Sequence, residues 1–313
     1  MLGKAHPALA VVAPPRLARF RERLGIQDDD PIDADFTGWS KLVLLTPAHA
    51  VLFPRDHTQV EPLWRDVAAL RAVEPLGLPC VPVVRDVFED PAISAYPVVV
   101  LDRLPGRPLD QLVESMPLEE LGDLFAELGR LAAGWHEVDV ALVPTLPRRS
   151  TLESTSLLVE ELELTAEEAA RARRALQRAR TLEAVLVHGD LHEGQLLVDP
   201  EPPHALTGIL DWQTARVDHP FVEFDLGEWG TALWRGHRVH LRELRRRAWD
   251  AYAAARRLPD DLAAVFEWHH TCAHARKVLG IDPFPVPHGP DVVGTASEAR
   301  EAVRSALASL VAE

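Results

Sequence analysis

The alternation of apolar and polar positions predicts a β-rich region in the first hundred residues. FTGWSKLVLLTPAHAVLFPR (residues 36–55) holds two apolar runs, LVLL and AVLF, joined by a short TPAH turn, which is the pattern of a β-hairpin. VPVVRDVF (81–88) and YPVVVLDRL (96–104) are also typical of strands. Between the two pairs, EPLWRDVAALRAV (61–73) repeats its apolar residues at helical spacing. We therefore expect the order strand, strand, helix, strand, strand.

The pattern changes after a Pro-Gly break in LPGRPLDQL (104–112), and helical spacing then dominates residues 117–138 and 158–180. AVLVHGD, QLLVD and LTGILDW predict short strands within this helical part. From residue 221 to about 279 the chain is helical again, and SEAREAVRSALASLVAE forms a last helix. The pattern predicts an α+β protein, with a small β-rich lobe over residues 1–104 and a larger, mainly helical lobe over residues 105–313.

The stretch LVHGDLHEGQLLVD (186–199) carries the densest chemistry, and two interpretations of it compete. His188, Asp190 and His192 alternate, so on one continuous strand they would share a face and could bind zinc. In the second interpretation, Asp190 follows a strand and orients an acceptor hydroxyl. A hairpin brings Gln195 beside Asp211, at the end of the next strand, as two oxygen ligands for Mg²⁺. The second interpretation uses more of the residues, and we favour it.

Composition narrows the class of function. The hydrophobic content of 47% excludes wholesale disorder, and the net charge of −15 argues against a nucleic-acid partner. An acidic field favours a cationic small substrate, although it also serves solubility alone. The segment EELELTAEE (160–168) and the group Glu223, Asp225 and Glu228 are candidates to line the site of such a substrate, although a solvated helix face explains the first group equally well. Cys80 and Cys272 are far apart, which argues against a disulfide scaffold. No run approaches the ~20 apolar residues of a membrane span, so we expect a soluble cytoplasmic protein without a membrane partner.

HGDLHEGQLLVD, followed by ILDWQTARVDHPFVEFDL, resembles the signature of the aminoglycoside phosphotransferase and choline kinase-like family. The usual form is HGDxxxxN, then a strand ending in Asp-Trp or Asp-Phe, then a D-P-x-x-D-L helix start. FTGWSKLVLL is similar to the first strand and nucleotide-covering loop, AVLFPR to the third strand, and VVVLDRLPG to the hinge. GRLAAGWHEVD is similar to the helix that ends in a Leu-His-like pair. The resemblance implies a two-lobed protein-kinase-like fold and an ATP-dependent small-molecule kinase.

The resemblance also implies roles for individual residues of the larger lobe. Asp190 would be the catalytic base, and Gln195 and Asp211 would hold Mg²⁺. His188 would brace the loop that carries the base. Asp225 would be a buried structural acid that ties this loop to the following helix.

In the smaller lobe the resemblance implies a site for ATP or GTP. The hinge backbone at Asp102 and Leu104 would hydrogen-bond the adenine edge, and Gly38, Trp39 and Ser40 would lie over the phosphates.

The chain departs from the family pattern at the cation that grips the phosphates. The family has a lysine or arginine inside the third strand, where this chain has Leu52 or Phe53. Arg55 shares a strand face with Phe53, so an ion pair between Arg55 and Asp66 is one solution, and Lys41 is a second candidate.

Gln195 is a second departure, because the family has asparagine there. The amide oxygen is retained, but the extra methylene shifts it by up to ~1.5 Å, and Mg²⁺ demands strict geometry. The leading hypothesis is a kinase of a small acceptor, either an aminoglycoside or a related cationic antibiotic. A nucleotide-binding pseudokinase and a kinase of a choline-like, amino-alcohol or sugar metabolite remain alternatives. A monomer and a homodimer are both open.

Overall fold

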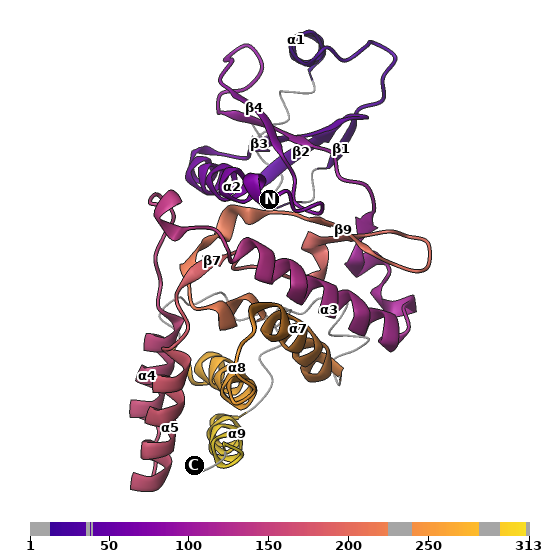
Figure 1. Ribbon diagram of the computed structural model, residues 1–313. Helices are drawn as coiled ribbons and strands as arrows, with labels where there is room; N and C mark the ends of the chain where they lie inside the picture. The colour runs from indigo at the N-terminus through magenta and orange to yellow at the C-terminus, as the bar shows by residue number, and fades with distance from the viewer. Residues whose placement is uncertain (1–12, 36–37, 39, 225–239, 282–294, 311–313) are drawn as a thin grey trace.

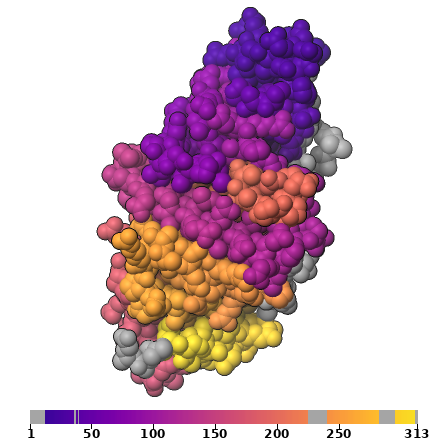
Figure 2. All heavy atoms as spheres, turned by 45° about the vertical axis from the view of Figure 1, so that its right-hand side comes forward, coloured from indigo at the N-terminus to yellow at the C-terminus, as the bar shows by residue number. Residues whose placement is uncertain are grey.

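The computed structural model describes residues 13–35, 38, 40–224, 240–281 and 295–310 as two stacked lobes (Figure 1). An antiparallel sheet and two helices, α1 and α2, form the upper lobe, and the remaining long helices lie below it. The space-filling view shows the same stacking, with the β-rich lobe at one end and the last helix near the other (Figure 2). This is the α+β, two-lobed, protein-kinase-like arrangement that the sequence predicts.

The sheet of the upper lobe has five antiparallel strands in the order β1-β2-β3-β5-β4. Its strands are β1 (Asp33–Asp35), β2 (Lys41–Leu45), β3 (His49–Pro54), β4 (Val84–Phe88) and β5 (Val98–Asp102). The predicted hairpin is therefore β2 and β3, and their register sets Lys41 opposite Pro54. The three-residue strand β1 was not predicted.

The two faces of this sheet pack against different partners, because successive side chains of a strand point to opposite faces. Leu42, Leu44 and Phe53 lie in a small core with Phe20 of α1 (Pro14–Leu24). Leu52 and the partly buried Val43 belong instead to the main core of the molecule. A residue two positions before Val43 is therefore on the face that points away from α1.

Helix α2 (Val60–Val73) connects the two lobes. Two short 3-10 helices flank it, η2 (His57–Gln59) and η3 (Glu74–Leu76). Its buried residues Leu63, Val67 and Leu70 belong to the same continuous core as Trp212 of the lower lobe. Because α2 is packed on that core, Asp66 on its buried side is held at the level where the lobes meet.

The lower lobe contains six long helices within the described ranges and two small sheets. The helices are α3 (Leu118–Trp135), α4 (Thr151–Glu161), α5 (Ala166–Ala179), α7 (Leu241–Arg256), α8 (Leu262–Leu279) and α9 (Ala296–Ala308). One sheet pairs β7 (Val185–Val187) with β10 (Arg216–Asp218), and the other has the order β6-β8-β9, formed by β6 (Arg107–Pro108), β8 (Leu196–Val198) and β9 (Leu206–Ile209).

Short 3-10 helices complete the lower lobe. They are η4 (Leu109–Gln111), η5 (Val113–Ser115), η6 (Val140–Leu142), η7 (Glu193–Gln195), η8 (Trp212–Thr214) and η9 (Pro220–Phe224). Two of them, η7 and η8, directly follow the loops that carry Asp190 and Asp211. The segments that carry the candidate chemistry are therefore short turns supported by strands and by the helices below.

In the lower lobe, the close packing of α3 against α7 depends on a glycine. A Cβ atom on Gly129 would lie 2.0 Å from the carbonyl oxygen of Ala248, far inside van der Waals contact. The two helices can approach this closely only because Gly129 has no side chain.

One helical expectation was wrong: residues 158–180 are not a single helix. The chain forms a hairpin of α4 and α5 instead, and the break lies at Leu162–Thr165. Thr165 and Glu168 form a reciprocal capping box that starts α5. The sequence LTAEE carries this helix-start signal, because a threonine followed three residues later by glutamate satisfies two orphan N–H groups.

Two expectations from composition can be compared with the described residues. None of the helices in these ranges is both long and apolar enough to cross a bilayer. Cys80 and Cys272 are both buried free thiols, and burial raises the pKa of Cys80 to about 11.

Candidate active site

Three charged side chains from three different elements meet where the lobes join. The Nζ of Lys41, the first residue of β2, donates to Asp66 Oδ2 of α2 at 2.5 Å and to Asp211 Oδ1 at 2.6 Å. Asp211 follows β9 and adopts a left-handed backbone conformation with φ of 65°. The other oxygen of Asp66 accepts the backbone N–H of Trp212 at 3.2 Å. The carboxylates of Asp66 and Asp211 are thus held on one ammonium group.

Burial sets the electrostatics of this cluster. Lys41 is 7% exposed and Asp66 is 2% exposed. Burial alone would lower the pKa of Lys41, but the two carboxylates outweigh it and hold the pKa above its ordinary value. Burial raises the pKa of Asp66, and the Lys41 charge opposes this. Lys41 is therefore a permanent cation, and it neutralises a carboxylate that water does not reach.

Of the two cations considered as partners of Asp66, Lys41 is the one whose Nζ contacts the Asp66 carboxylate. The reason is strand parity. Phe53 faces the core under α1, whereas Leu52 faces the main core and α2. Lys41 is two residues before Val43 and lies on the same face as Leu52. Arg55 is two residues after Phe53 and therefore shares its strand face. Its backbone N–H donates to the carbonyl oxygen of Ser40 at 2.9 Å.

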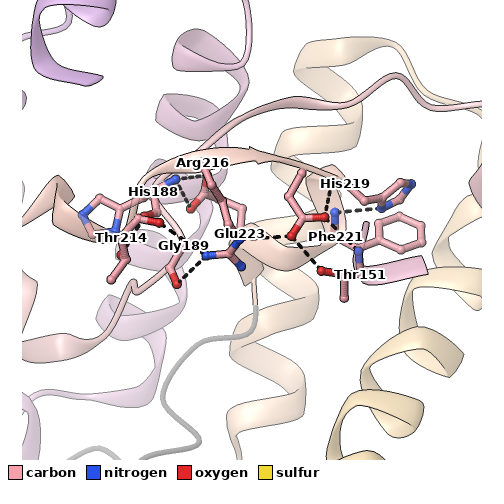
Figure 3. Close-up of polar contacts among 9 residues, drawn as sticks. Thr151, His188, Gly189, Thr214, Arg216, His219, Phe221 and Glu223 are labelled. Carbon is pink, nitrogen blue, oxygen red and sulfur yellow. Dashed lines mark hydrogen bonds and ion pairs between the residues drawn. The ribbon is translucent and has the colours of Figure 1, made fainter. Parts of the chain in front are cut away.

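The loop that carries Asp190 is fixed through its backbone (Figure 3). The peptide between Gly189 and Asp190 is bonded at both ends: Arg216 Nη1 donates to Gly189 O at 3.2 Å, and Asp190 N–H donates to His188 Nδ1 at 3.4 Å. Thr214 Oγ1 donates to the preceding carbonyl, His188 O, at 2.9 Å. The Asp190 carboxylate itself makes no hydrogen bond with the described residues, and this backbone sets the direction in which its side chain leaves the loop.

We call the contacts of His188, Thr214, Arg216 and Glu223 that hold the loop of Asp190 the brace. His188 is its central residue. Its ring is fully buried, donates from Nε2 to Leu210 O at 2.8 Å and packs edge-on to Trp212 with ring centroids 4.8 Å apart. Its backbone N–H donates to both carboxylate oxygens of Glu223, at 3.1 and 3.0 Å. Because Leu210 directly precedes Asp211, His188 connects the two loops that carry acids.

Glu223 has a buried bracing role that the sequence interpretation missed. Besides His188, it accepts from the Trp135 indole at 2.9 Å and from His136 Nε2 at 3.0 Å. His136 Nδ1 in turn accepts from the Tyr252 hydroxyl at 3.0 Å. Burial alone would raise the pKa of Glu223, but the bond from His136 and the neighbouring donors hold it below its ordinary value. Glu223 is therefore a buried carboxylate tied to the base loop and to the end of α3.

The structural acid was expected at Asp225, which lies outside the described residues. The spacing D-P-x-x-D places the acid three residues after the proline, and three residues after Pro220 is Glu223. The signal was present in the sequence, but glutamate stands where the pattern has aspartate. Trp135 and His136 are the Leu-His-like pair at the end of α3, and both of them bond Glu223.

The structure brings Gln195 and Asp211 together. Gln195 Nε2 donates to Asp211 Oδ2 at 3.3 Å, and the β8–β9 pairing sets this approach. Asp211 is partly open, with 24% of its side chain exposed. One carboxylate and one amide oxygen form a donor set that suits Mg²⁺ when phosphates and water supply the other ligands.

The strand-face interpretation of a zinc site was wrong. Strand β7 ends at Val187, so His188, Asp190 and His192 do not continue one strand. His192 Nδ1 accepts from Gly194 N–H at 3.1 Å, and His188 is occupied in the brace. Across the described ranges, no group of three His, Cys, Asp or Glu side chains has a metal-binding arrangement.

The residues expected to bind the nucleotide base are at the end of β5. The Asp102 N–H donates to Val83 O at 3.0 Å, and its carboxylate accepts two bonds from Arg85. The Leu104 N–H has no partner among the described residues. Gly38 and Ser40 lie directly before Lys41, between β1 and β2, and Trp39 lies outside the described residues.

Three of the acidic side chains that favoured a cationic acceptor, Glu167, Glu168 and Glu223, have other partners. Glu223 is buried in the brace, and Asp225 and Glu228 lie outside the described residues. The segment EELELTAEE (160–168) forms the turn between α4 and α5, at the end of the hairpin that points away from the sheet (Figure 1). Within it, Glu168 caps α5 and Glu167 pairs with Arg171.

Solved structures of antibiotic phosphotransferases share this fold. The GDP complex of aminoglycoside 2'-phosphotransferase-IIIa is 15% identical, with a TM-score of 0.56 over 95% of this chain and 99% of that one. Macrolide 2'-phosphotransferase from Brachybacterium faecium is 19% identical, with a TM-score of 0.53 over 95% and 99%. A streptomycin-ATP ternary complex of APH(2")-IIa is 15% identical, with a TM-score of 0.50 over 93% and 98%.

No curated protein matches the sequence significantly. The family model "Phosphotransferase enzyme family" matches residues 40–275, about three quarters of the chain and all of the site described above except Gly38. The matched span begins just before Lys41 and includes the base loop, Asp211 and Glu223. The chain belongs to this phosphotransferase family.

Proposed function

We propose that this protein transfers the γ-phosphoryl group of ATP or GTP to a hydroxyl group of a small molecule. The observation that carries the proposal is the meeting of Lys41, Asp66 and Asp211 beside a braced loop that presents the unbonded carboxylate of Asp190. A fixed cation, a metal-ligating acid and an unpaired acid are the groups that phosphoryl transfer requires of a protein.

In this mechanism Asp190 orients the acceptor hydroxyl and accepts its proton. As the hydroxyl oxygen bonds to the γ-phosphorus, the bond from that phosphorus to the bridging oxygen breaks and the nucleoside diphosphate leaves. The proton passes from Asp190 to solvent. The ammonium of Lys41 binds the phosphate oxygens of the nucleotide, and Asp66 holds that ammonium in place.

Gln195 and Asp211 are the residues that would hold Mg²⁺. Their donor set fits, since Gln195 offers an amide oxygen when its amide is turned, and Asp211 offers a partly open carboxylate. When bound, the ion supplies charge neutralisation on the phosphates. Asp211 is held for this role by its bond to Lys41.

For the nucleotide base, the carbonyl of Asp102 and the N–H of Leu104 are the proposed partners. Gly38 and Ser40 are proposed to lie over the phosphates, because the covering loop leads directly into Lys41. The relatives that share the fold were solved with GDP, and with ATP, so either purine is a candidate.

For the acceptor, we propose an antibiotic hydroxyl, of the aminoglycoside or macrolide kind. The fold relatives named above are aminoglycoside and macrolide phosphotransferases, and the net charge of −15 supports a cationic acceptor. The acidic groups first considered for such an acceptor do not add to this support.

The test is a turnover assay with MgATP and MgGTP against a panel of aminoglycosides, macrolides, amino alcohols and sugars. We expect one class to gain a phosphoryl group by mass spectrometry. The Asp190→Asn variant should lose about 10²–10⁴-fold of this rate, the usual contribution of a positioned base, with unchanged nucleotide affinity.

Other outcomes separate the alternatives. Phosphorylation of an amino alcohol or sugar alone would make the protein a metabolite kinase. Nucleotide binding without turnover across the panel would indicate a pseudokinase. Full activity in Asp190→Asn would refute the assignment of the base.

A further inference from the structure

Arg216 makes a contact that the proposed reaction does not itself require. Its guanidinium is buried to 12% side-chain exposure and donates from Nη1 to Gly189 O at 3.2 Å and, more weakly, to Thr214 O at 3.5 Å. Gly189 O and Asp190 N belong to one peptide unit. Arg216 therefore holds one end of this unit while His188 holds the other.

Glycine is required for this contact. Gly189 has φ of 83°, and a Cβ atom there would lie 2.1 Å from Arg216 Nη1 and 2.8 Å from Thr214 O. The guanidinium thus occupies the space where any other residue would carry its side chain. The left-handed backbone and the close guanidinium together leave the Gly189–Asp190 peptide one orientation.

Asp218 holds Arg216 and also holds the first turn of α4. Its fully buried carboxylate accepts from Arg216 Nε at 3.1 Å, from Thr151 N at 3.0 Å and from Thr151 Oγ1 at 2.7 Å. The residues before α4 are tied to the same strand, since Arg149 N donates to Val217 O at 2.9 Å. A continuous chain of bonds leads from α4 to the peptide beside Asp190.

We propose that Arg216 is a positioning residue of the phosphoryl-transfer site. It fixes the Gly189–Asp190 peptide, which sets the direction of the Asp190 side chain. Through Asp218, it makes this direction depend on the position of α4. The inference rests on the proposed function, because it assigns Asp190 the role of base. Arg216 itself touches neither nucleotide nor acceptor in this scheme.

The experiment compares Arg216→Met and Arg216→Lys with the wild-type protein in turnover of MgATP and MgGTP, with water as the acceptor. Arg216→Met should lower the turnover rate about 10- to 100-fold, because small misplacements of a reacting group have effects of this size. The KM for the nucleotide should stay within about twofold of wild type, since binding groups are untouched. Arg216→Lys keeps a charged donor and should recover part of the rate.

Hydrogen exchange gives a readout that needs no activity. In Arg216→Met the amides of residues 188–192 should exchange faster, while those of β2 and α2 should not change. Arg246→Met is the matched control, because Arg246 pairs with Asp250 on the exposed side of α7 and should leave turnover and exchange unchanged. Thr151→Val, which removes one bond to Asp218, should lower turnover less, and its effect should not multiply with that of Arg216→Met.

The outcomes separate the inference from the proposed function. If the wild-type protein shows no turnover but the amides of residues 188–192 exchange faster in Arg216→Met, the proposed function fails. The role of Arg216 in holding this loop is then still supported. Unchanged exchange and unchanged turnover in Arg216→Met would overturn the inference. If the effects of Thr151→Val and Arg216→Met on turnover multiply in the double variant, the inferred connection between α4 and the loop of Asp190 is wrong.

Discussion

The charge cluster and the loop brace meet at Leu210 and Asp211, yet they are built from opposite kinds of interaction. In the cluster, Lys41, Asp66 and Asp211 contact one another through charged side-chain ends from β2, α2 and the end of β9. In the brace, Glu223 and Arg216 bind backbone N–H and C=O groups of the base loop, all within the lower lobe.

The difference indicates which part is free to change during a reaction. The cluster joins the two lobes, and incoming phosphates offer Lys41 a further anion, so its bonds can be exchanged. The brace leaves the backbone around Asp190 no alternative partner, because His188 N, His188 O, Gly189 O and Asp190 N are all bonded. In the proposed mechanism, the backbone that carries the base is therefore fixed, whereas the phosphate-binding side is adjustable.

The largest effect should come from breaking the cluster with Lys41→Met. Removing the cation leaves Asp66 buried beside the Asp211 carboxylate, and breaking a buried ion pair from one side costs about 3–5 kcal/mol. We expect the free energy of unfolding, measured in urea, to fall by this amount. Loss of a fixed charge at the phosphates should also lower turnover by about 10²–10³-fold.

A second variant separates stability from catalysis. Lys41→Met combined with Asp66→Asn removes the unpaired charge but keeps an acceptor for Trp212 N–H. Most of the lost stability should return, while turnover stays low. Recovery of turnover in the double variant would contradict the role of Lys41, and Arg55→Met should then be examined.

An effect of intermediate size is expected beside the brace, at His219. Its Nε2 donates to Ala179 O and its Nδ1 accepts from Phe221 N–H, so both nitrogens are occupied in the neutral ring. Burial lowers the pKa of His219 to about 4. Because the unfolded chain then binds a proton at a higher pH than the folded protein, stability is complete above pH ~6.5 and falls as the pH drops towards 4.

The measurement is urea unfolding of the wild type and of His219→Gln at about pH 7 and about pH 4.5. The wild type should lose about 2–3 kcal/mol more than the variant between these values. Glutamine can make both hydrogen bonds without titrating. Equal losses in the two proteins would show that His219 is not buried as a neutral ring.

The smallest effect should come from Gln195→Asn, which restores the family's residue. A shorter side chain withdraws the amide that now contacts Asp211 and changes the metal-binding geometry. We expect the Mg²⁺ concentration for half-maximal turnover to shift by about two- to fivefold, with little change in stability. No shift would indicate that Gln195 does not bind the metal.

Much of the fold could be predicted from sequence patterns. Strong periodicity predicted the hairpin of β2 and β3, the helix α2 and the strand pair β8 and β9 to within a few residues. The α4–α5 break was missed because the apolar spacing continues across the capping box at Thr165. Helix α1 was not predicted; it begins at two prolines, which the first turn of a helix tolerates well.

Site residues could be predicted where short spacing along the chain brings them together. They were uncertain where the prediction depends on which face of a strand points to the site. Gln195 and Asp211 were placed together from one hairpin, and the structure brings them into contact. The choice between Arg55 and Lys41 depends on which face of β2 and β3 points to α2, and this is fixed only when α1 covers the other face. Arg216 carries no motif, since its role depends on a contact with Gly189 in the folded chain.

The position of Lys41 has a consequence for how relatives are sorted into active and inactive proteins. A survey that looks for the basic residue in the third strand would find Leu52 and class this chain as catalytically dead. In the proposed mechanism the physical requirement is an ammonium beside Asp66, and the first residue of β2 places one there. Other family members without the expected lysine should be checked at the residue that pairs with the end of β3 before they are described as having lost their activity.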